Sequence, residues 1–148
     1  MMNISTMTGL EIMQAFADGH FPAPSITKTI PMQMSKIELN RVVFIATANE
    51  HHLNPMGGVH GGFAATVLDS VTGCATHTAL GVGEGYGTIE LSIKMCRPIP
   101  RYKSLIAEGR VINKSRSLVI SEGDIKDEEG NLYAHATATC MIIQAQKA

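Results

Sequence analysis

One carboxylate stands alone in a long stretch of the chain that otherwise carries no full charge at neutral pH. Within residues 51–83 that carboxylate belongs to Asp69, and the pattern around it is that of a mostly apolar helix. A buried carboxylate is costly unless it is paired or hydrogen-bonded, and carboxylates kept at that cost are often chemically active. The alternative is that Asp69 faces solvent on a thin polar stripe with Thr66, Ser70 and Thr76.

A glycine-rich segment comes directly before this pattern. It contains Asn54 and Met56 and ends in His60-Gly61-Gly62. Glycines at a helix start cost helix propensity but leave the backbone N–H groups accessible. These donors are unpaired and lie at the positive end of the helix dipole, so they can stabilise the oxyanion that forms when a thioester carbonyl is attacked. The alternative is a tight turn that allows close helix–sheet packing.

The spacing of these two features limits how they can act together. Gly61 and Asp69 are eight positions apart, which is roughly 12 Å along one helix. Groups that act on one carbonyl must lie about 3 Å from it. If both residues act on the same carbonyl, they therefore come from two chains whose helices run antiparallel across a two-fold axis. This predicts an isologous dimer with two equivalent sites.

The elements that position these residues follow from hydrophobic patterning. Residues 8–18 predict a short helix with Thr8 as its cap, and residues 59–80 predict a long one that ends before Gly81. Residues 37–48 predict a strand, and four more are expected at 87–97, 104–113, 117–127 and 132–143.

Two of the expected strands have informative faces. In residues 87–97, one face carries Ile89, Leu91, Ile93 and Met95, and the opposite face carries Thr88, Glu90, Ser92 and Lys94. In residues 132–143, one face carries the small side chains of Ala134, Ala136, Ala138 and Cys140, which would let a helix approach the sheet closely.

The order of elements predicts an α+β fold. Short turns at residues 113–116 and 128–131 join the later strands, so we expect antiparallel pairing, with one face of the sheet covered by the long helix. A length of 148 residues fits a single domain over 1–148, in which residues 1–24 form an N-terminal helix and connector.

The pattern Asn54-x5-His60-Gly61-Gly62-x6-Asp69 resembles the motif of the PaaI-type hotdog thioesterases. That group contains phenylacetyl-CoA and medium- or long-chain acyl-CoA thioesterases, and its fold is an antiparallel sheet wrapped around one long central helix. The resemblance covers residues 37–143. It implies an acyl-CoA hydrolase that needs no metal or other cofactor, since coenzyme A is part of the substrate, and a homodimer that commonly pairs into a homotetramer.

The resemblance also implies a role for each residue of the motif. Asp69 would be the general base that activates water, or the nucleophile that forms a transient anhydride. The Gly61 N–H, with Gly62 as a candidate second donor, would hold the thioester oxygen. Asn54 would orient the water or the thioester, and His60 would lie beside the carbonyl as a donor or a structural cap.

Thr88 falls where the family carries a Ser or Thr that helps position the water. The resemblance divides the site between two subunits. One subunit would supply Asn54, His60 and Gly61, and its partner would supply Asp69 and Thr88.

Coenzyme A carries phosphates, so we expect basic residues beside the site. The candidates are Arg97, Lys103, Lys114 and Arg116, although for each one taken alone an ordinary solvated charge is the favoured interpretation. Met56 is a candidate for lining an adaptable acyl pocket.

Composition argues against several other classes of protein. The formal net charge is −1 and no long charged run occurs, so there is no case for nucleic-acid or membrane-surface binding. No signal-peptide pattern or membrane span is evident, and a cytoplasmic location is expected. The wide spacing of Cys74, Cys96 and Cys140 favours buried free thiols, and no spacing of His and Cys indicates a metal site.

Two other functions remain open at this stage. One is a hydratase or dehydratase of the same fold, in which His60 would act with Asp69 of the partner. The other is a catalytically silent acyl-CoA binding module, because a fold does not fix a function.

Overall fold

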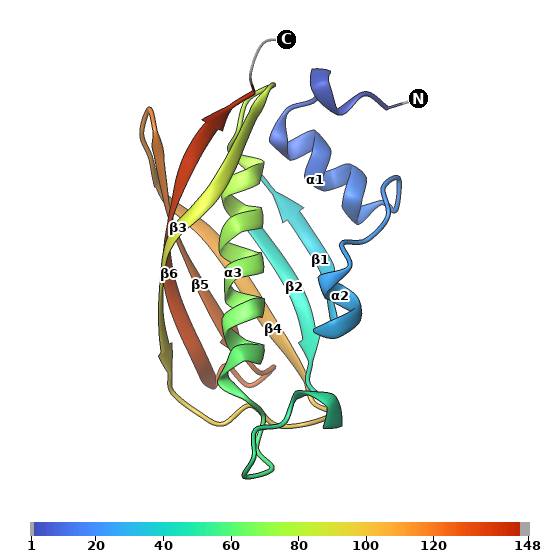
Figure 1. The fold of residues 1–148 in the computed structure, drawn as a ribbon, viewed down its shortest axis with the longest axis vertical. Coiled ribbons are helices and arrows are strands. Elements are labelled where there is room, and N and C mark those ends of the chain that lie inside the picture. Colours follow the sequence, from blue (N-terminus) through green and yellow to red (C-terminus); the bar gives the residue numbers. More distant parts are fainter. Residues whose placement is uncertain (1, 146–148) are drawn as a thin grey trace.

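The computed structural model describes residues 2–145. Along the chain the elements are η1 (Ile4–Thr6), α1 (Gly9–Ala17), α2 (Ile26–Thr29), β1 (Met32–Glu38), β2 (Arg41–Thr47), η2 (Glu50–His52), α3 (Gly61–Thr78), β3 (Glu84–Met95), β4 (Ser104–Lys114), β5 (Leu118–Lys126) and β6 (Leu132–Gln144). All neighbouring strands are antiparallel, in the order β1-β2-β4-β5-β6-β3. The sheet curves around α3, as Figure 1 shows, which confirms the predicted α+β architecture.

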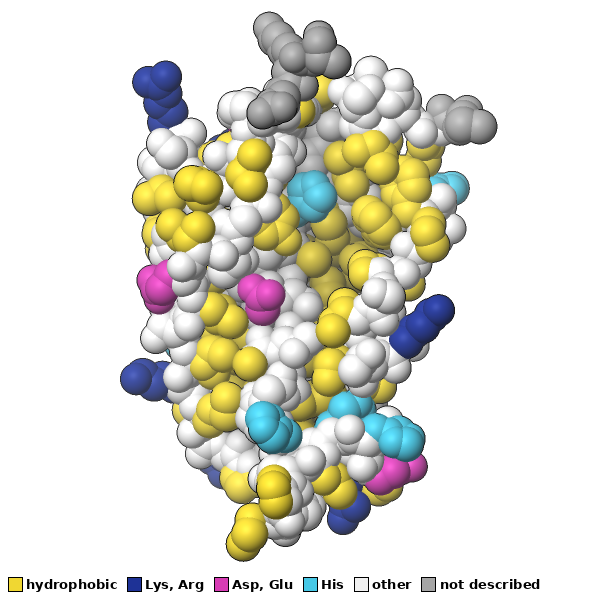
Figure 2. All heavy atoms as spheres, viewed as in Figure 1, with side chains coloured by type: hydrophobic (Ala, Val, Ile, Leu, Met, Phe, Trp, Pro, Cys, Tyr) yellow, Lys and Arg dark blue, Asp and Glu magenta, His cyan; other side chains and the backbone are white. Residues whose placement is uncertain are grey.

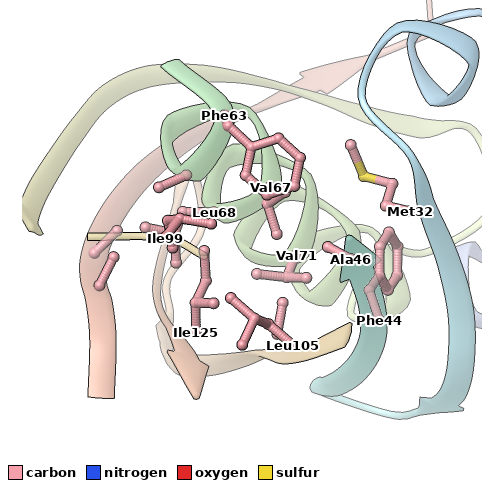
Figure 3. Packing of buried hydrophobic residues seen from close by; sticks show 14 of the residues in the cluster. Met32, Phe44, Ala46, Phe63, Val67, Leu68, Val71, Ile99, Leu105 and Ile125 are labelled. Carbon is pink, nitrogen blue, oxygen red and sulfur yellow. The ribbon is translucent and has the colours of Figure 1, made fainter. Parts of the chain in front are cut away.

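Helix α3 buries one side against the concave face of the sheet. Phe63, Val67, Leu68 and Val71 on this side are no more than 2% exposed, and they pack among apolar side chains of the sheet (Figure 3). The opposite side of the helix is only partly covered. The helix therefore has an inner face that holds the fold together and an outer face that is available for chemistry.

Two strand glycines allow the helix to lie against the sheet. A Cβ atom on Gly109 of β4 would lie 2.0 Å from the Val71 carbonyl oxygen, and one on Gly123 of β5 would lie 3.2 Å from side-chain atoms of Val71 and Thr72. The predicted small face of β6 is also confirmed, because Ala134, Ala136, Ala138 and Cys140 are at most 1% exposed. The tightest approach, however, is over β4.

The prediction of one strand over residues 37–48 was wrong. The chain forms a hairpin in which Glu38 of β1 pairs with Arg41 of β2, so Leu39 and Asn40 make a two-residue turn. Asn40 adopts a φ of 66°, a left-handed conformation that asparagine tolerates better than most residues. Asn40 was the available signal, but the apolar residues on either side of it masked the turn.

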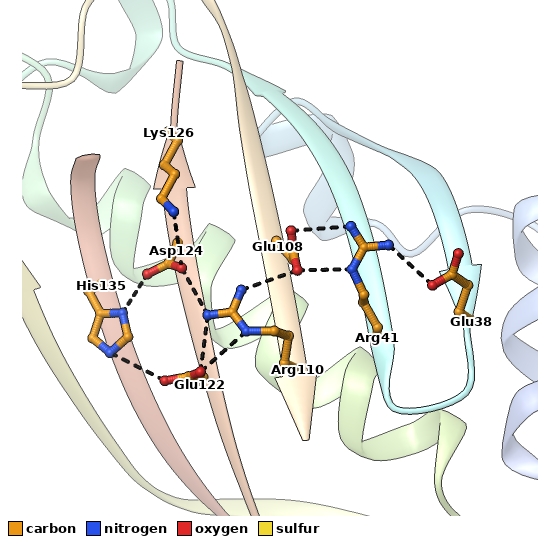
Figure 4. A network of polar contacts seen from close by, with 8 residues as sticks. All are labelled: Glu38, Arg41, Glu108, Arg110, Glu122, Asp124, Lys126 and His135. Carbon is orange, nitrogen blue, oxygen red and sulfur yellow. Dashed lines mark hydrogen bonds and ion pairs between the residues drawn. The ribbon is translucent and has the colours of Figure 1, made fainter. Parts of the chain in front are cut away.

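The convex face of the sheet is covered by alternating charges. Arg110 of β4 contacts Glu108, Glu122 and Asp124 at 2.9–3.2 Å, and Arg41 of β2 joins Glu108 from the other side. Figure 4 shows this network extending across the strands. Its remaining members are Glu38, Lys126 and His135. These charges keep this part of the convex face hydrated.

Helix α1 packs against the C-terminal end of α3. Thr8 caps it in a reciprocal pair with Glu11, as its sequence predicted. The Gly9 N–H donates to the Leu80 carbonyl at 3.0 Å, and a Cβ on Gly9 would lie 1.8 Å from the His77 carbonyl oxygen. Within the described residues, no helix has both the length and the hydropathy to cross a membrane.

Replacing Gly109 with alanine should lower the free energy of unfolding by about 2–3 kcal/mol, because the new methyl group would collide with helix backbone that has no rotamer to change. Gly85→Ala is the matched control, since its Cβ would meet nothing closer than 3.8 Å. The control should change stability by no more than about 0.5 kcal/mol. Chemical denaturation measures both, and equal stability of the two variants would contradict the packing argument.

Candidate active site

Asp69 lies midway along α3, on the face turned away from the sheet. In the single chain its side chain is exposed, which agrees with the alternative that Asp69 faces solvent on a polar stripe. Thr66 and Ser70 flank it, and their hydroxyl groups donate to helix carbonyls four residues earlier at 2.9 and 2.8 Å. Thr76 does not belong to this stripe, because it is buried and hydrogen-bonded to Ser121.

The carboxylate of Asp69 is the free group of this stripe. Within the described residues it takes part in no hydrogen bond and no ion pair. The neighbouring hydroxyl groups are already committed to the helix backbone. Asp69 can therefore accept a proton or attack a carbonyl without first breaking a contact of the fold.

Asp69 stands at the edge of an apolar pocket with a volume of about 500 Å³. Figure 2 shows this hollow, with a hydrophobic floor, between the central helix and the N-terminal segment. The helix contributes Asp69, Ser70 and Cys74 to its lining. The rest of the lining consists of Phe16, Ala17, Ala23, Pro24, Ile26 and Thr27 from the N-terminal segment, Met32, Gln33, Met34 and Phe44 from β1 and β2, and Tyr86 and Thr88 from β3.

Sequence reasoning missed most of this lining. Residues 1–24 were predicted as a helix and a connector with no part in the site, and residues of both form one wall of the pocket. A local pattern cannot show that residues 16–27 fold back across Asp69, because that contact spans more than forty positions. One signal was present: Gly73, a glycine inside a helix, marks a close approach by another group.

A bulge in β3 places Thr88 beside Asp69. Thr88 pairs with Cys140 and Glu90 pairs with Thr139, so Ile89 is an extra residue in the strand. The strict alternation predicted for residues 87–97 was therefore wrong. Thr88 lies on the same side of the sheet as Leu91, across from the helix-facing residues of β6, and its hydroxyl lies 3.7 Å from the Cys140 sulfur. Both Asp69 and Thr88 line the pocket.

His60 caps the N-terminus of α3. Its Nδ1 accepts a hydrogen bond from the Gly62 N–H at 2.7 Å. An imidazole nitrogen that accepts carries no proton, so the neutral ring carries its proton on Nε2 and presents a donor there. The geometry supports the structural-cap alternative for His60, and it leaves no free basic nitrogen of the kind that a hydratase would require.

This cap separates the two glycines at the helix entrance. The Gly62 N–H is occupied by His60, whereas the Gly61 N–H makes no hydrogen bond within the part of the chain that is described. The Phe63 N–H donates to the His60 carbonyl at 3.0 Å. Gly61 is therefore the available backbone donor at this end of the helix, and Gly62 is not a second one.

Asn54 organises the loop before the helix. Its side-chain oxygen accepts from the N–H groups of Met56 and Gly58 at 2.9 and 3.2 Å. This leaves the side-chain amide as a donor near the helix entrance. Met56 lies at the tip of the same loop and is 92% exposed, and it is not part of the pocket beside Asp69 in its own chain.

The basic candidates lie at different ends of α3. Arg97 shares a hollow with Gly61 and Met95 at the N-terminus of the helix. Lys114 donates to the Ala79 carbonyl at 2.7 Å, so it caps the opposite end. Arg116 is exposed in the β4–β5 turn, and Lys103 pairs with Asp127 at 3.2 Å. Only Arg97 lies beside a predicted catalytic group of its own chain.

The cysteines show no sign of a nucleophile. Burial, reinforced by the negative charge of Asp69, raises the pKa of Cys74 to about 12, so this thiol stays protonated at neutral pH. Cys140 is buried, Cys74 is partly buried and Cys96 is exposed, which corrects the expectation that all three thiols are buried. Among residues 2–145, no cluster of His, Cys, Asp and Glu side chains could hold a metal ion.

Many solved structures resemble this one, and three of them illustrate the likeness. The phenylacetic acid degradation-related protein of Ralstonia eutropha JMP134 has 27% sequence identity and a TM-score of 0.79, over 87% of this chain and 98% of the other. The Escherichia coli PaaI protein, at 15% identity, has a TM-score of 0.80 over 93% and 98% of the two chains. The smu.793 protein of Streptococcus mutans UA159, solved bound to acetyl CoA, has 22% identity and a TM-score of 0.70 over 78% and 91%.

The architecture and these likenesses define the class: this is a hotdog-fold protein with a long central helix wrapped by an antiparallel sheet. The model of the thioesterase superfamily matches residues 56–134, which is more than half of the chain. The chain belongs to the thioesterase superfamily, and it is a thioester hydrolase. The predicted PaaI-type resemblance is thereby confirmed.

A thiol reagent applied to the folded protein at about pH 8 should modify Cys96 quickly and leave Cys74 unmodified, because a pKa of about 12 keeps the Cys74 thiol protonated. Mass spectrometry of proteolytic peptides identifies the modified residue. In Cys96→Ser the fast phase should disappear. Rapid labelling of Cys74 in a protein that remains folded would show that this thiol is activated.

Proposed function

We propose that the protein hydrolyses acyl-CoA thioesters to a free acid and CoA at a site shared by two subunits. Asp69 and Thr88 of one subunit act on a carbonyl held by the Gly61 N–H of the other. The observation that carries the proposal is the free carboxylate of Asp69 at the mouth of an apolar pocket that can receive an acyl group. Asn54 and His60 supply further donors beside Gly61.

The need for two subunits follows from the rigidity of α3. Gly61 and Asp69 occupy positions 1 and 9 of one continuous helix, so they lie roughly 12 Å apart along its axis. No side-chain rotation closes that gap to the contact distance of about 3 Å that catalysis requires. An antiparallel copy of the helix brings the entrance of one helix opposite the centre of the other.

Strand β3 provides the edge along which such a copy can pair. It is twelve residues long and pairs with β6 on one side only. A long edge strand with exposed apolar residues invites pairing with another chain, and Ile89 on this edge is 57% exposed. A groove along the helix and this strand contains Asp69, Thr88 and Ile89. Pairing two copies of β3 about a two-fold axis would cover this groove.

Two balanced routes start from the carboxylate. As a general base, Asp69 takes a proton from water while the water oxygen bonds to the thioester carbon, and the C–S bond then breaks and releases CoA thiol and the acid. As a nucleophile, a carboxylate oxygen of Asp69 bonds to that carbon and CoA leaves, and water then cleaves the anhydride. In both routes the Gly61 N–H stabilises the charge that develops on the carbonyl oxygen.

In the bound substrate, the CoA portion would extend from the thioester past the N-terminus of the α3 helix whose Gly61 holds the carbonyl. Arg97 lies in the same hollow as Gly61, and a guanidinium group suits phosphate recognition. The streptococcal protein of the same fold was solved with acetyl CoA, which supports this class of substrate. The proposed assembly is a homodimer, and a dimer of dimers is the further expectation.

Asp69→Asn should lower kcat for acyl-CoA hydrolysis by about 10²–10⁴-fold, because the amide can neither accept the proton nor attack the carbonyl. A reagent that detects released CoA thiol measures the rate on a panel of acyl-CoAs. Glu128→Gln is the control, since it neutralises an exposed carboxylate in the β5–β6 turn. Full activity in Asp69→Asn would remove this residue from the mechanism.

Gly61→Pro should lower kcat by about 10²–10³-fold, because proline removes the N–H donor and is accepted at the first position of a helix. Gly61→Ala is the matched control. It keeps the N–H and introduces the same Cβ, which would lie 3.0 Å from the flexible end of Met95. If alanine and proline reduce kcat equally, the loss comes from crowding and not from the missing donor.

Mixing the two inactive variants tests the shared site. In a dimer of one Gly61→Pro chain and one Asp69→Asn chain, one of the two sites is assembled from intact halves. Co-expression in equal amounts should therefore restore about a quarter of the wild-type activity, since about half of the dimers are mixed. Mixtures that stay inactive, although mass spectrometry detects the mixed dimer, would place both groups within one chain.

A further inference from the structure

One polar group of the pocket has no role in the chemistry proposed above. The hydroxyl of Tyr86 on β3 belongs to the lining, and burial raises the pKa of this hydroxyl well above its usual range. Within residues 2–145 the hydroxyl forms no hydrogen bond, although every fully enclosed polar side-chain atom there has a partner. The Tyr86 hydroxyl is therefore not sealed in the core, and it opens onto the pocket.

The other hydroxyl groups of the pocket wall are already engaged. Ser70 donates to the Thr66 carbonyl, and the Thr88 hydroxyl contacts the Cys140 sulfur. Buried tyrosine hydroxyl groups usually find a partner, because leaving one unpaired costs stability. The Tyr86 hydroxyl opens onto the pocket, so its partner has to come from the pocket contents and not from the fold. A phenylalanine at position 86 would fill nearly the same volume, so packing alone does not explain the hydroxyl.

A glycine in helix α3 makes room for the Tyr86 side chain. Gly73 lies inside α3 and is buried, where glycine is the least favourable residue after proline. A Cβ on Gly73 would lie 2.6 Å from the Tyr86 hydroxyl oxygen and 3.1 Å from its ring. Any larger residue would displace the phenol. Glycine at this position is what allows the hydroxyl group to lie against the helix.

Two independent measures place this hydroxyl relative to Asp69. Gly73 is four residues beyond Asp69, about 6 Å along the helix. Tyr86 is two residues before Thr88 on β3, about 7 Å along the strand. Since Asp69 and Thr88 lie at the reacting end of the pocket, the Tyr86 hydroxyl lies about 6–7 Å deeper along it. That distance corresponds to roughly five bonds of an extended acyl chain.

We propose that Tyr86 is a specificity-determining residue, whose hydroxyl hydrogen-bonds an oxygen atom carried by the acyl group roughly five bonds from the thioester carbonyl carbon. The preferred substrate class is then an oxygen-bearing acyl-CoA, favoured over a hydrocarbon chain of the same shape. The proposal rests on the proposed function, because it assumes that the thioester carbonyl lies beside Asp69 when it is attacked. A polar anchor in an apolar pocket fixes the orientation of a ligand in this way.

The test compares two substrates with the same number and branching of heavy atoms, 5-oxohexanoyl-CoA and 5-methylhexanoyl-CoA. At the expected distance the first carries a carbonyl oxygen and the second carries a methyl group. The wild-type enzyme should give the oxo substrate the higher kcat/KM, by about five- to tenfold. In Tyr86→Phe this ratio should fall to about one, because only the hydroxyl has been removed.

Two further variants separate recognition from structure. Gly73→Ala keeps the hydroxyl but displaces it, and should also lower the ratio. Tyr102→Phe removes a hydroxyl that bonds Glu50 far from the pocket, and should keep the wild-type ratio. Thermal unfolding provides an independent readout: a purely structural role of the Tyr86 hydroxyl would make Tyr86→Phe less stable and leave the ratio unchanged.

A ratio that is the same in the wild type and in Tyr86→Phe would overturn the role of Tyr86 while leaving thioester hydrolysis intact. A wild-type enzyme that hydrolyses no acyl-CoA would instead overturn the proposed function, and the assignment of Tyr86 with it. The two failures are therefore distinguished in one set of assays.

Discussion

The rigid separation of two positions on one helix governs the rest of this protein. Among residues 2–145, the Gly61 N–H at the start of α3 and the Asp69 carboxylate at its centre form no hydrogen bond. Continuous helical hydrogen bonding keeps them about 12 Å apart. In the proposed mechanism a single chain therefore carries two half-sites, and hydrolysis of a thioester requires one half from each of two chains. In the proposed dimer the helix acts as a spacer that places each half against the complementary half of the other chain.

Such a spacer works only if the helix is held firmly and its working groups remain free. The inner face of α3 is held by apolar packing and by its close approach to Gly109. Around the site, polar side chains stabilise the backbone through hydrogen bonds. His60 caps the Gly62 N–H, Asn54 closes the preceding loop, and the two hydroxyl groups next to Asp69 bond the helix backbone. Among the described residues of the site, these contacts leave the Gly61 N–H free to donate a hydrogen bond and the Asp69 carboxylate free to accept one.

Local sequence patterns predicted the parts of the fold that depend on local physics. Helix α3 begins and ends within two residues of its predicted limits, and Thr8 caps α1 as its side chain indicated. The β1–β2 turn at Leu39 and Asn40 was missed because apolar residues lie on both sides of it, and the bulge at Ile89 was missed because this residue fits the alternating pattern. Long-range packing decides both. A strand that alternates strictly in its sequence gives no sign that one residue is extra.

The candidate site divides in the same way. Residues with a distinctive local setting, such as Asp69 and Gly61, could be identified from the sequence, since a lone charge and a glycine pair stand out against their neighbours. The sequence could not decide between a buried and an exposed Asp69, because the surroundings of this residue come from a connector more than forty positions earlier and from a strand that follows the helix. The pocket could not be predicted for the same reason. Its wall is assembled from separate segments, and none of them has a sequence pattern that indicates a binding site.

Glycine connects local sequence with long-range packing. It lowers the stability of the helix or strand that contains it, but it allows a residue distant in the sequence to come close. In α3 and the strands beneath it, glycine recurs where another group comes too close for a Cβ: Gly109 faces a helix carbonyl and Gly73 faces the Tyr86 hydroxyl. The first contact builds the fold, since a backbone atom must be accommodated. The second concerns a side chain that phenylalanine could replace with little change in volume. Where glycine makes room for a polar group that packing does not need, the polar group is better explained by what it binds.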